Sequence, residues 1–113
     1  MTDRVERFKK ERQRLNDLIL RRENIDIKRF FALDGAVYRD GALDVKTKEM
    51  LGLVASLVLR CDDCISYHTI GIREQNVSDE EFDEIMAVGM LVGGSITIPH
   101  VRRAYDLWED LKK

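Results

Sequence analysis

Apolar residues recur along this chain at the three- and four-residue spacing of helices, and no segment combines strand alternation with hairpin turns. The first predicted helix runs from Arg4 to about Glu23 and is charged over most of its surface. A second apolar stripe covers residues 27–38 and ends where Asp40-Gly41 breaks the chain. We therefore expect two helices first, of which the charged one is solvated and suited to dock on a partner subunit.

The segment from residue 45 to about residue 59 is the most apolar part of the chain. Asp44 predicts an N-cap for a helix here. The apolar residues after Glu49 cannot share one face, so this helix should lie in the middle of a bundle or at a subunit interface. A parallel strand is the competing interpretation, but the length of the run without a turn signal favours a helix.

Three further helices complete the pattern. One should begin near Cys61 and run to about residue 74. Ser78 and Glu81 fit a capping box for the next helix, which Gly93-Gly94 should end. Ser95 is then predicted to cap the last helix. The whole chain, residues 1–113, is therefore predicted to form one all-α domain of about six helices.

Composition and charge narrow the function classes. The chain has 113 residues, which suits one domain, and its net charge of -2 favours neither nucleic acid nor an anionic membrane. The first segment is charged throughout and no run of 18 apolar residues exists, so we expect a cytoplasmic protein without signal peptide or membrane span. Cytosolic thiols are mostly reduced, so a close cysteine pair is more typical of redox or metal chemistry than of a structural bridge.

The two cysteines, Cys61 and Cys64, lie three residues apart at a predicted helix start. Unpaired N–H groups and the positive dipole end of the first turn favour a thiolate, which is the nucleophilic form. The spacing also lets the two sulfurs meet and cycle between dithiol and disulfide. His68 shares a helical face with Cys64 and could relay its proton. Glu49 could hold the imidazole in one tautomer.

Two features work against this interpretation. Asp62 and Asp63 place negative charge beside the cysteines, which disfavours a thiolate, and they could be simple first-turn acids. The expected helix lengths also argue against a contact between Glu49 and His68. If two antiparallel helices turn near Arg60, Glu49 lies about 16 Å from the turn and His68 about 10 Å, at the helical rise per residue. The pair is then one turn out of step, and the long Glu side chain or an early helix end would have to close the gap.

A zinc site is the rival chemistry. Cys61, Cys64, His68 and His100 supply two thiolates and two imidazoles, the ligand set of tetrahedral zinc. His100 follows far along the chain, however, and Cys-x-x-Cys-x-x-x-His is not the spacing of a zinc finger. His100 could equally be an interface or substrate residue beside two arginines. A zinc-stabilised helical binding module is therefore the alternative function.

The pattern of Glu49, eleven residues, the sequence CDDC, three residues and His68 resembles the carboxymuconolactone decarboxylase and AhpD-like alkylhydroperoxidase family. The segment GMLVGGSITIPHVRRA, residues 89–104, also resembles the part that follows the cysteine helix in single-domain members. The resemblance covers roughly residues 31–108. The charged N-terminal helix, residues 1–24, lies outside it.

The resemblance implies an AhpD-like helical bundle with the cysteines at the start of a core helix, assembled as a homo-oligomer, commonly a trimer or hexamer. It implies a thiol-dependent, peroxiredoxin-like oxidoreductase in which Cys64 attacks a hydroperoxide and Cys61 resolves the sulfenate to a disulfide. Glu49 and His68 would form the proton relay. The implied partners are a hydroperoxide and a dithiol, thioredoxin-like or lipoyl reductant, and we expect neither cofactor nor metal.

One position departs from the alkylhydroperoxidase pattern. Those proteins carry a histidine immediately before the second cysteine, and this chain has Asp63 there. Because of this departure, general disulfide reductase activity is an alternative to peroxide reduction. A further alternative is a reaction of the decarboxylase branch, whose lactone chemistry does not rest on the cysteine pair.

Overall fold

The computed structural model describes residues 2–113, which are helical wherever they form regular secondary structure. The expected all-α fold of about six helices is confirmed, and the cysteine pair lies at the start of a helix as predicted. A single short 3₁₀ turn, η1, precedes the last helix. The elements are α1 (Asp3–Leu20), α2 (Ile25–Val37), α3 (Val45–Leu59), α4 (Asp62–Glu74), α5 (Asp79–Gly93), η1 (Ser95–Thr97) and α6 (Ile98–Asp110).

Side-chain caps fix two of the helix starts where the sequence predicts them. The Asp44 carboxylate accepts a hydrogen bond from the backbone N–H of Thr47 at the start of α3 (2.8 Å). Ser78 and Glu81 form the capping box of α5, with each side chain accepting from the other residue's backbone. These caps satisfy backbone donors that have no partner inside the helix.

The predicted cap at Ser95 is wrong. Gly94 has a φ of +84°, a conformation that favours glycine, and the chain then makes the 3₁₀ turn before α6 starts. The N-cap position of α6 is Thr97, whose backbone is helical, so it lacks the extended geometry of a side-chain cap. Its hydroxyl instead donates to the Gly94 carbonyl (2.8 Å).

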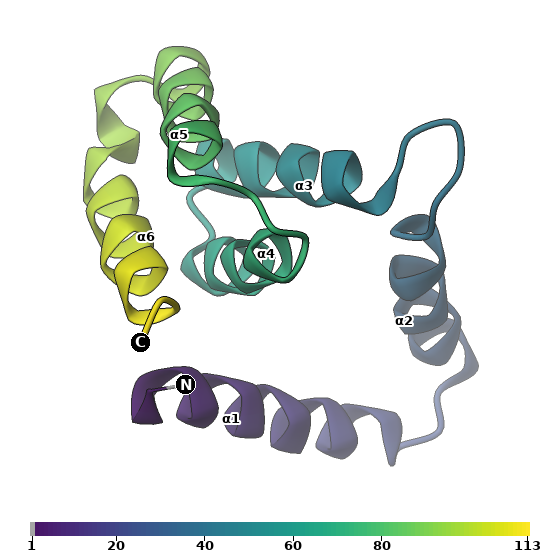
Figure 1. Ribbon diagram of the computed structural model, residues 1–113. Coiled ribbons are helices and arrows are strands. Elements are labelled where there is room, and N and C mark those ends of the chain that lie inside the picture. Colours follow the sequence, from purple (N-terminus) through teal and green to yellow (C-terminus); the bar gives the residue numbers. More distant parts are fainter. Residues whose placement is uncertain (1) are drawn as a thin grey trace.

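Helix α4 lies in the middle of the molecule, with α3, α5, α6 and α1 around it (Figure 1). The main core fills the space between α3, α4, α5 and α6, where the Phe82 and Trp108 rings stack with centroids 4.4 Å apart. Burial of these large apolar side chains is the main source of stability. The buried residues of this core are Leu53, Leu57, Ile65, Ile72, Val77, Phe82, Ile85, Met86, Val101, Ala104 and Trp108.

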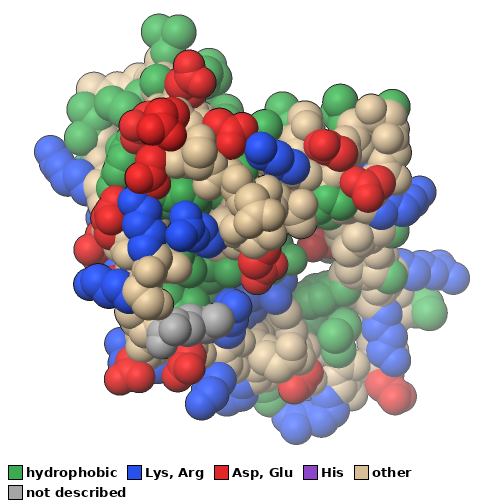
Figure 2. Space-filling model, in the orientation of Figure 1, with side chains coloured by type: hydrophobic (Ala, Val, Ile, Leu, Met, Phe, Trp, Pro, Cys, Tyr) green, Lys and Arg blue, Asp and Glu red, His purple; other side chains and the backbone are tan. Residues whose placement is uncertain are grey.

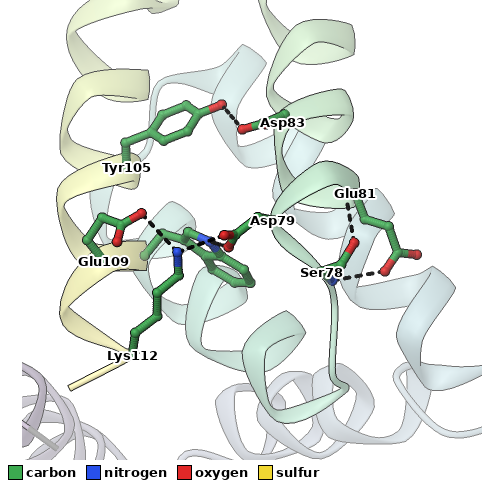
Figure 3. A network of polar contacts seen from close by, with 8 residues as sticks. Ser78, Asp79, Glu81, Asp83, Tyr105, Glu109 and Lys112 are labelled. Carbon is green, nitrogen blue, oxygen red and sulfur yellow. Dashed lines mark hydrogen bonds and ion pairs between the residues drawn. The ribbon is translucent and has the colours of Figure 1, made fainter.

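Polar contacts at the edge of this core join α6 to the first turns of α5 (Figure 3). The Trp108 indole N–H donates to Asp79 (2.8 Å), and the Lys112 ammonium binds the other oxygen of the same carboxylate (2.9 Å). One helical turn further along, the Tyr105 hydroxyl donates to Asp83 (2.6 Å). The buried indole therefore has its N–H satisfied, as buried tryptophan requires.

Helices α1 and α2 lie outside the main core. Val5 anchors α1 in a small cluster with Ile70 and Leu107, and the Arg4 guanidinium binds carboxylates of α6. All residues of α2 are described by the structure, and none of them is buried. In Figure 1 α2 links the end of α1 to the loop before α3 and stands apart from the remaining helices.

The apolar helix α3 is buried on one face only. Leu53 and Leu57 are fully buried, whereas Leu51 and Leu59 are exposed. Its predicted place in the middle of the bundle therefore holds for half of its surface within one chain. Across residues 2–113 no helix combines the length and apolar character that a membrane span needs.

Candidate functional site

Cys61 and Cys64 form a disulfide at the start of α4, with Cα atoms 5.3 Å apart. Arg60 ends α3 in the left-handed conformation, and Cys61 follows at once as the N-cap of α4. The Cys61 sulfur accepts from the backbone N–H of Cys64 (3.3 Å). Cys64 is an exposed residue, whereas Cys61 is only partly exposed. The structure thus holds the oxidised state of the dithiol/disulfide pair that the spacing predicts.

Glu49 and His68 meet in the interior between α3 and α4. The two side chains are buried, and Nδ1 of His68 lies 2.7 Å from Oε2 of Glu49. A carboxylate accepts, so Nδ1 carries a hydrogen and donates it, which leaves Nε2 as the acceptor of a neutral ring. The predicted gap of one helical turn between these residues is therefore closed.

Two glycines that the sequence interpretation overlooked make room for the side chains that bridge this gap. A Cβ at Gly52 would lie 2.8 Å from Cε1 of His68, and a Cβ at Gly71 would lie 2.7 Å from Oε2 of Glu49. Each functional side chain thus occupies the space that a glycine leaves on the facing helix. The signal was present, because both glycines fall inside helices, where glycine is unfavourable without a packing reason.

Tyr38, just after α2, is a further member of the site that sequence reasoning missed. Its hydroxyl lies 3.4 Å from Nε2 of His68, and the two ring centroids are 5.3 Å apart. Tyr67 places its ring against the same imidazole, edge-on at 5.3 Å. Burial, together with the negative charge of Glu49, raises the pKa of Tyr38 above its usual value. The phenol therefore keeps its proton near neutral pH and faces the imidazole as a donor.

A cavity of about 570 Å³ opens beside the disulfide. Cys64 and His68 both line it, together with the apolar side chains of Phe8, Leu15 and Tyr67. In Figure 2 the visible face is hollowed between α4 and the α1–α2 end of the molecule, with hydrophobic side chains along the hollow. The cavity is large enough for a molecule of ligand size beside both Cys64 and His68.

A smaller cavity of about 300 Å³ lies along α1 and is lined by Glu49 and Gly71. Phe8, Arg12 and Tyr67 line both cavities and so lie between them, with the Arg12 guanidinium carbon 4.1 Å from the centre of the Tyr67 ring. The carboxylate–imidazole pair therefore spans from one cavity to the other.

The charge of Asp62 beside Cys61 is balanced from α6. Nδ1 of His100 lies 2.7 Å from one carboxylate oxygen, and the Arg103 guanidinium lies 3.1 Å from the other. Partial burial opposes ionisation, yet the hydrogen bonds from these two side chains hold the pKa of Asp62 below its usual value. The predicted first-turn acid is thus an ion-pair member, and its effect on the neighbouring thiol is reduced. Asp63 is exposed and lines the larger cavity.

The four side chains of the zinc alternative are not gathered at one point. Cys61 and Cys64 are bonded to each other, His68 binds Glu49, and His100 binds Asp62. Among the described residues, no three His, Cys, Asp or Glu side chains are arranged to hold a metal ion.

Comparison with known proteins gives a family match. The model of the carboxymuconolactone decarboxylase family matches residues 27–107, which include all four predicted site residues. Two crystal structures of a Thermotoga maritima protein are 53% identical to this chain. The first match covers 95% of this chain and 94% of the Thermotoga chain, with a TM-score of 0.92. The second covers 94% of this chain and 90% of the Thermotoga chain, with a TM-score of 0.89. The second describes a carboxymuconolactone decarboxylase family protein with a possible part in an antioxidative response.

More distant relatives share the fold or part of the sequence. A carboxymuconolactone decarboxylase family protein from Legionella pneumophila, in its apo form, is 23% identical with a TM-score of 0.87, over 99% of this chain and 100% of that chain. At this identity the likeness shows the fold alone. An uncharacterized protein of a cox locus in Paracoccus denitrificans is 28% identical over 82 residues, which are 73% of this chain and 74% of the relative.

Proposed function

The chain belongs to the carboxymuconolactone decarboxylase family, and from this premise we propose that it is an AhpD-like thiol-disulfide oxidoreductase that reduces organic hydroperoxides. One observation carries the proposal: the exposed residue Cys64 and the buried residue His68 line the same cavity. Glu49 binds the far nitrogen of that imidazole. The Thermotoga relative's possible part in an antioxidative response agrees with this activity.

The proposed cycle starts from the reduced pair. His68 takes the proton of the Cys64 thiol, and Glu49 stabilises the imidazolium that forms. The thiolate attacks the terminal oxygen of the hydroperoxide and the O–O bond breaks. The alkoxide leaves with the proton from His68 as an alcohol, and Cys64 becomes a sulfenic acid.

The second half restores the disulfide. The Cys61 thiolate attacks the Cys64 sulfur, the S–O bond breaks, and hydroxide leaves with a proton as water. The product is the Cys61–Cys64 bond present in the structure. An external dithiol then returns two electrons and two protons. One hydroperoxide and one dithiol thus yield an alcohol, water and an external disulfide.

The roles of the two cysteines are tested by trapping the sulfenate. In Cys61→Ser, peroxide should leave a sulfenic acid on Cys64 that dimedone labels, because no resolving thiol is near. In Cys64→Ser, dimedone should label Cys61 little, and dithiol-dependent peroxide consumption should cease. Labelling only at Cys61, or equally at both positions, would overturn the assignment.

A general disulfide reductase is the second candidate, and Asp63 favours it. This carboxylate lines the larger cavity where alkylhydroperoxidases carry a histidine, so a negative charge that disfavours the thiolate takes the place of a second imidazole beside Cys64. The same preparations separate the two activities. Turnover of a small-molecule disulfide without peroxide consumption would support the reductase and reject the peroxidase.

A further inference from the structure

Helix α1 forms much of the wall of the cavity beside Cys64. Phe8 and Leu15 supply its apolar part, and Tyr67 of α4 adds a third apolar surface. All of α1 precedes residue 27, where the match to the family model begins. The reactive side chains thus come from the matched region, whereas the surface that a substrate's body would contact comes largely from the helix before it.

The first half of α1 is held firmly against the rest of the molecule. Val5 is fully buried, Arg4 binds Asp106 (2.7 Å) and Asp110 (3.1 Å), and Arg12 stacks on Tyr67. Leu15 lies one turn beyond Arg12. It lines the cavity and is still 43% exposed, so it offers apolar surface there without being part of the core. A substitution at Leu15 therefore changes the cavity wall while the anchors of α1 persist.

The charges around the cavity do not select an anion. Its lining contains two arginines and three carboxylates, an excess of one negative charge. The Arg12 guanidinium already lies over the Tyr67 ring. The lining therefore offers no net positive charge to an anionic substrate, and the apolar side chains of Phe8, Leu15 and Tyr67 suit an uncharged body.

The size of the cavity also favours a bulky substrate. Its volume of about 570 Å³ is in the range of sites for drug-sized ligands. Hydrogen peroxide is a molecule of a few tens of Å³, on the order of one or two waters, and would leave most of this wall without contact.

We propose that α1 sets the substrate preference of this protein, with Leu15 as a specificity-determining residue whose side chain binds the uncharged apolar body of a bulky hydroperoxide. The inference rests on the proposed peroxidase function and adds to it the element that selects the substrate. Binding energy at Leu15 is available to a bulky hydroperoxide and unavailable to hydrogen peroxide, so the wall discriminates between them.

The test compares Leu15→Ala with Leu18→Ala, using cumene hydroperoxide and hydrogen peroxide as probes. Leu18 is the matched control, because it is on the same helix, is 39% exposed and is absent from the cavity lining. Leu15→Ala should lower kcat/KM for cumene hydroperoxide about fivefold, as expected for losing a half-exposed Leu side chain from the contact. It should leave kcat/KM for hydrogen peroxide unchanged, and Leu18→Ala should change neither value.

An equal fall with both peroxides, or no fall with cumene hydroperoxide, would overturn the proposal. If the wild type consumes neither peroxide, the proposed function fails and the wall is tested by alkylation instead. In a Cys61→Ser background, the rate of Cys64 alkylation by apolar N-phenylmaleimide relative to iodoacetamide should fall about fivefold on Leu15→Ala. An unchanged ratio would reject the role of Leu15.

Discussion

Gly71 lies so close to Glu49 that one added methyl group should disconnect the carboxylate from His68. In Gly71→Ala the new Cβ would lie 2.7 Å from Oε2 and 2.9 Å from the carboxyl carbon of Glu49, distances that real Cβ atoms essentially never show. The carboxylate is the end of a flexible side chain, so it should swing aside while the helices stay in place. The change therefore breaks the 2.7 Å contact to Nδ1 of His68 without removing either residue.

The size of the effect follows from two opposing terms. Replacing glycine by alanine inside a helix stabilises by about 1 kcal/mol. Losing a buried hydrogen bond to a charged group costs about 1.5–3 kcal/mol. Gly71→Ala should therefore lower the free energy of unfolding by about 0.5–2 kcal/mol, which lowers Tm by several degrees in a domain of this size. Proton transfer by a positioned base is worth about 10²-fold or more, so losing its orienting partner should slow Cys64 alkylation at least about tenfold.

The assay measures iodoacetamide alkylation of reduced protein near neutral pH, with thermal unfolding followed by circular dichroism. Gly35→Ala is the control, since Gly35 is also helical and an added Cβ would meet no atom of the described residues within 4 Å. It should raise the stability by up to about 1 kcal/mol and leave alkylation unchanged. If Gly71→Ala gains stability like Gly35→Ala and alkylates at the wild-type rate, the carboxylate–imidazole pair does not act as the relay.

Two further predictions concern regions away from this contact. Burial, with the hydrogen bond to Asp83, raises the pKa of Tyr105 to about 12, so absorbance at 295 nm should show a phenolate step near pH 12 that Tyr105→Phe lacks. Because the folded pKa is raised, the stabilising contribution is complete below about pH 10, the ordinary tyrosine value, and is lost as pH rises towards 12. Leu91 is 86% and Leu59 is 75% exposed, so we expect a homo-oligomer, for which the family resemblance implies a trimer or hexamer, and Leu91→Glu should weaken it. Sedimentation of the wild type as a stable monomer at micromolar concentration would contradict the expected homo-oligomer.

Local features of this fold were predictable from sequence because they depend on neighbours in the chain. The caps at Asp44 and Ser78 needed only a side chain three residues from a helical N–H. The cap at Ser95 failed because Gly94 redirects the backbone into a 3₁₀ turn, a choice that the capping pattern does not report.

Sequence reasoning named Glu49 and His68 as candidates, and the structure places the two side chains in contact, but that reasoning did not find Tyr38 or the geometry of the contact. Glu49 and His68 could be named from their spacing, but an estimate from helix rise treats helices as rods of uniform thickness. Two glycines give each side chain room against the facing helix, and the length of the Glu49 side chain bridges the offset along the helix axes. Tyr38 could not be found this way, because its contact with His68 depends on how the chain enters α3 after α2. Such a contact between segments distant in sequence has no local signal.

The two cavities on either side of Arg12 and Tyr67 give the carboxylate–imidazole pair two separate faces. His68 lines the larger cavity and Glu49 lines the smaller one, which runs beside the exposed side chain of Gln13. A molecule filling the larger cavity would seal the imidazole from water on that side and leave the carboxylate side uncovered. In the proposed cycle, proton exchange with the solvent and substrate entry would therefore follow different routes, and a bulky substrate would not block the re-protonation of the proposed relay.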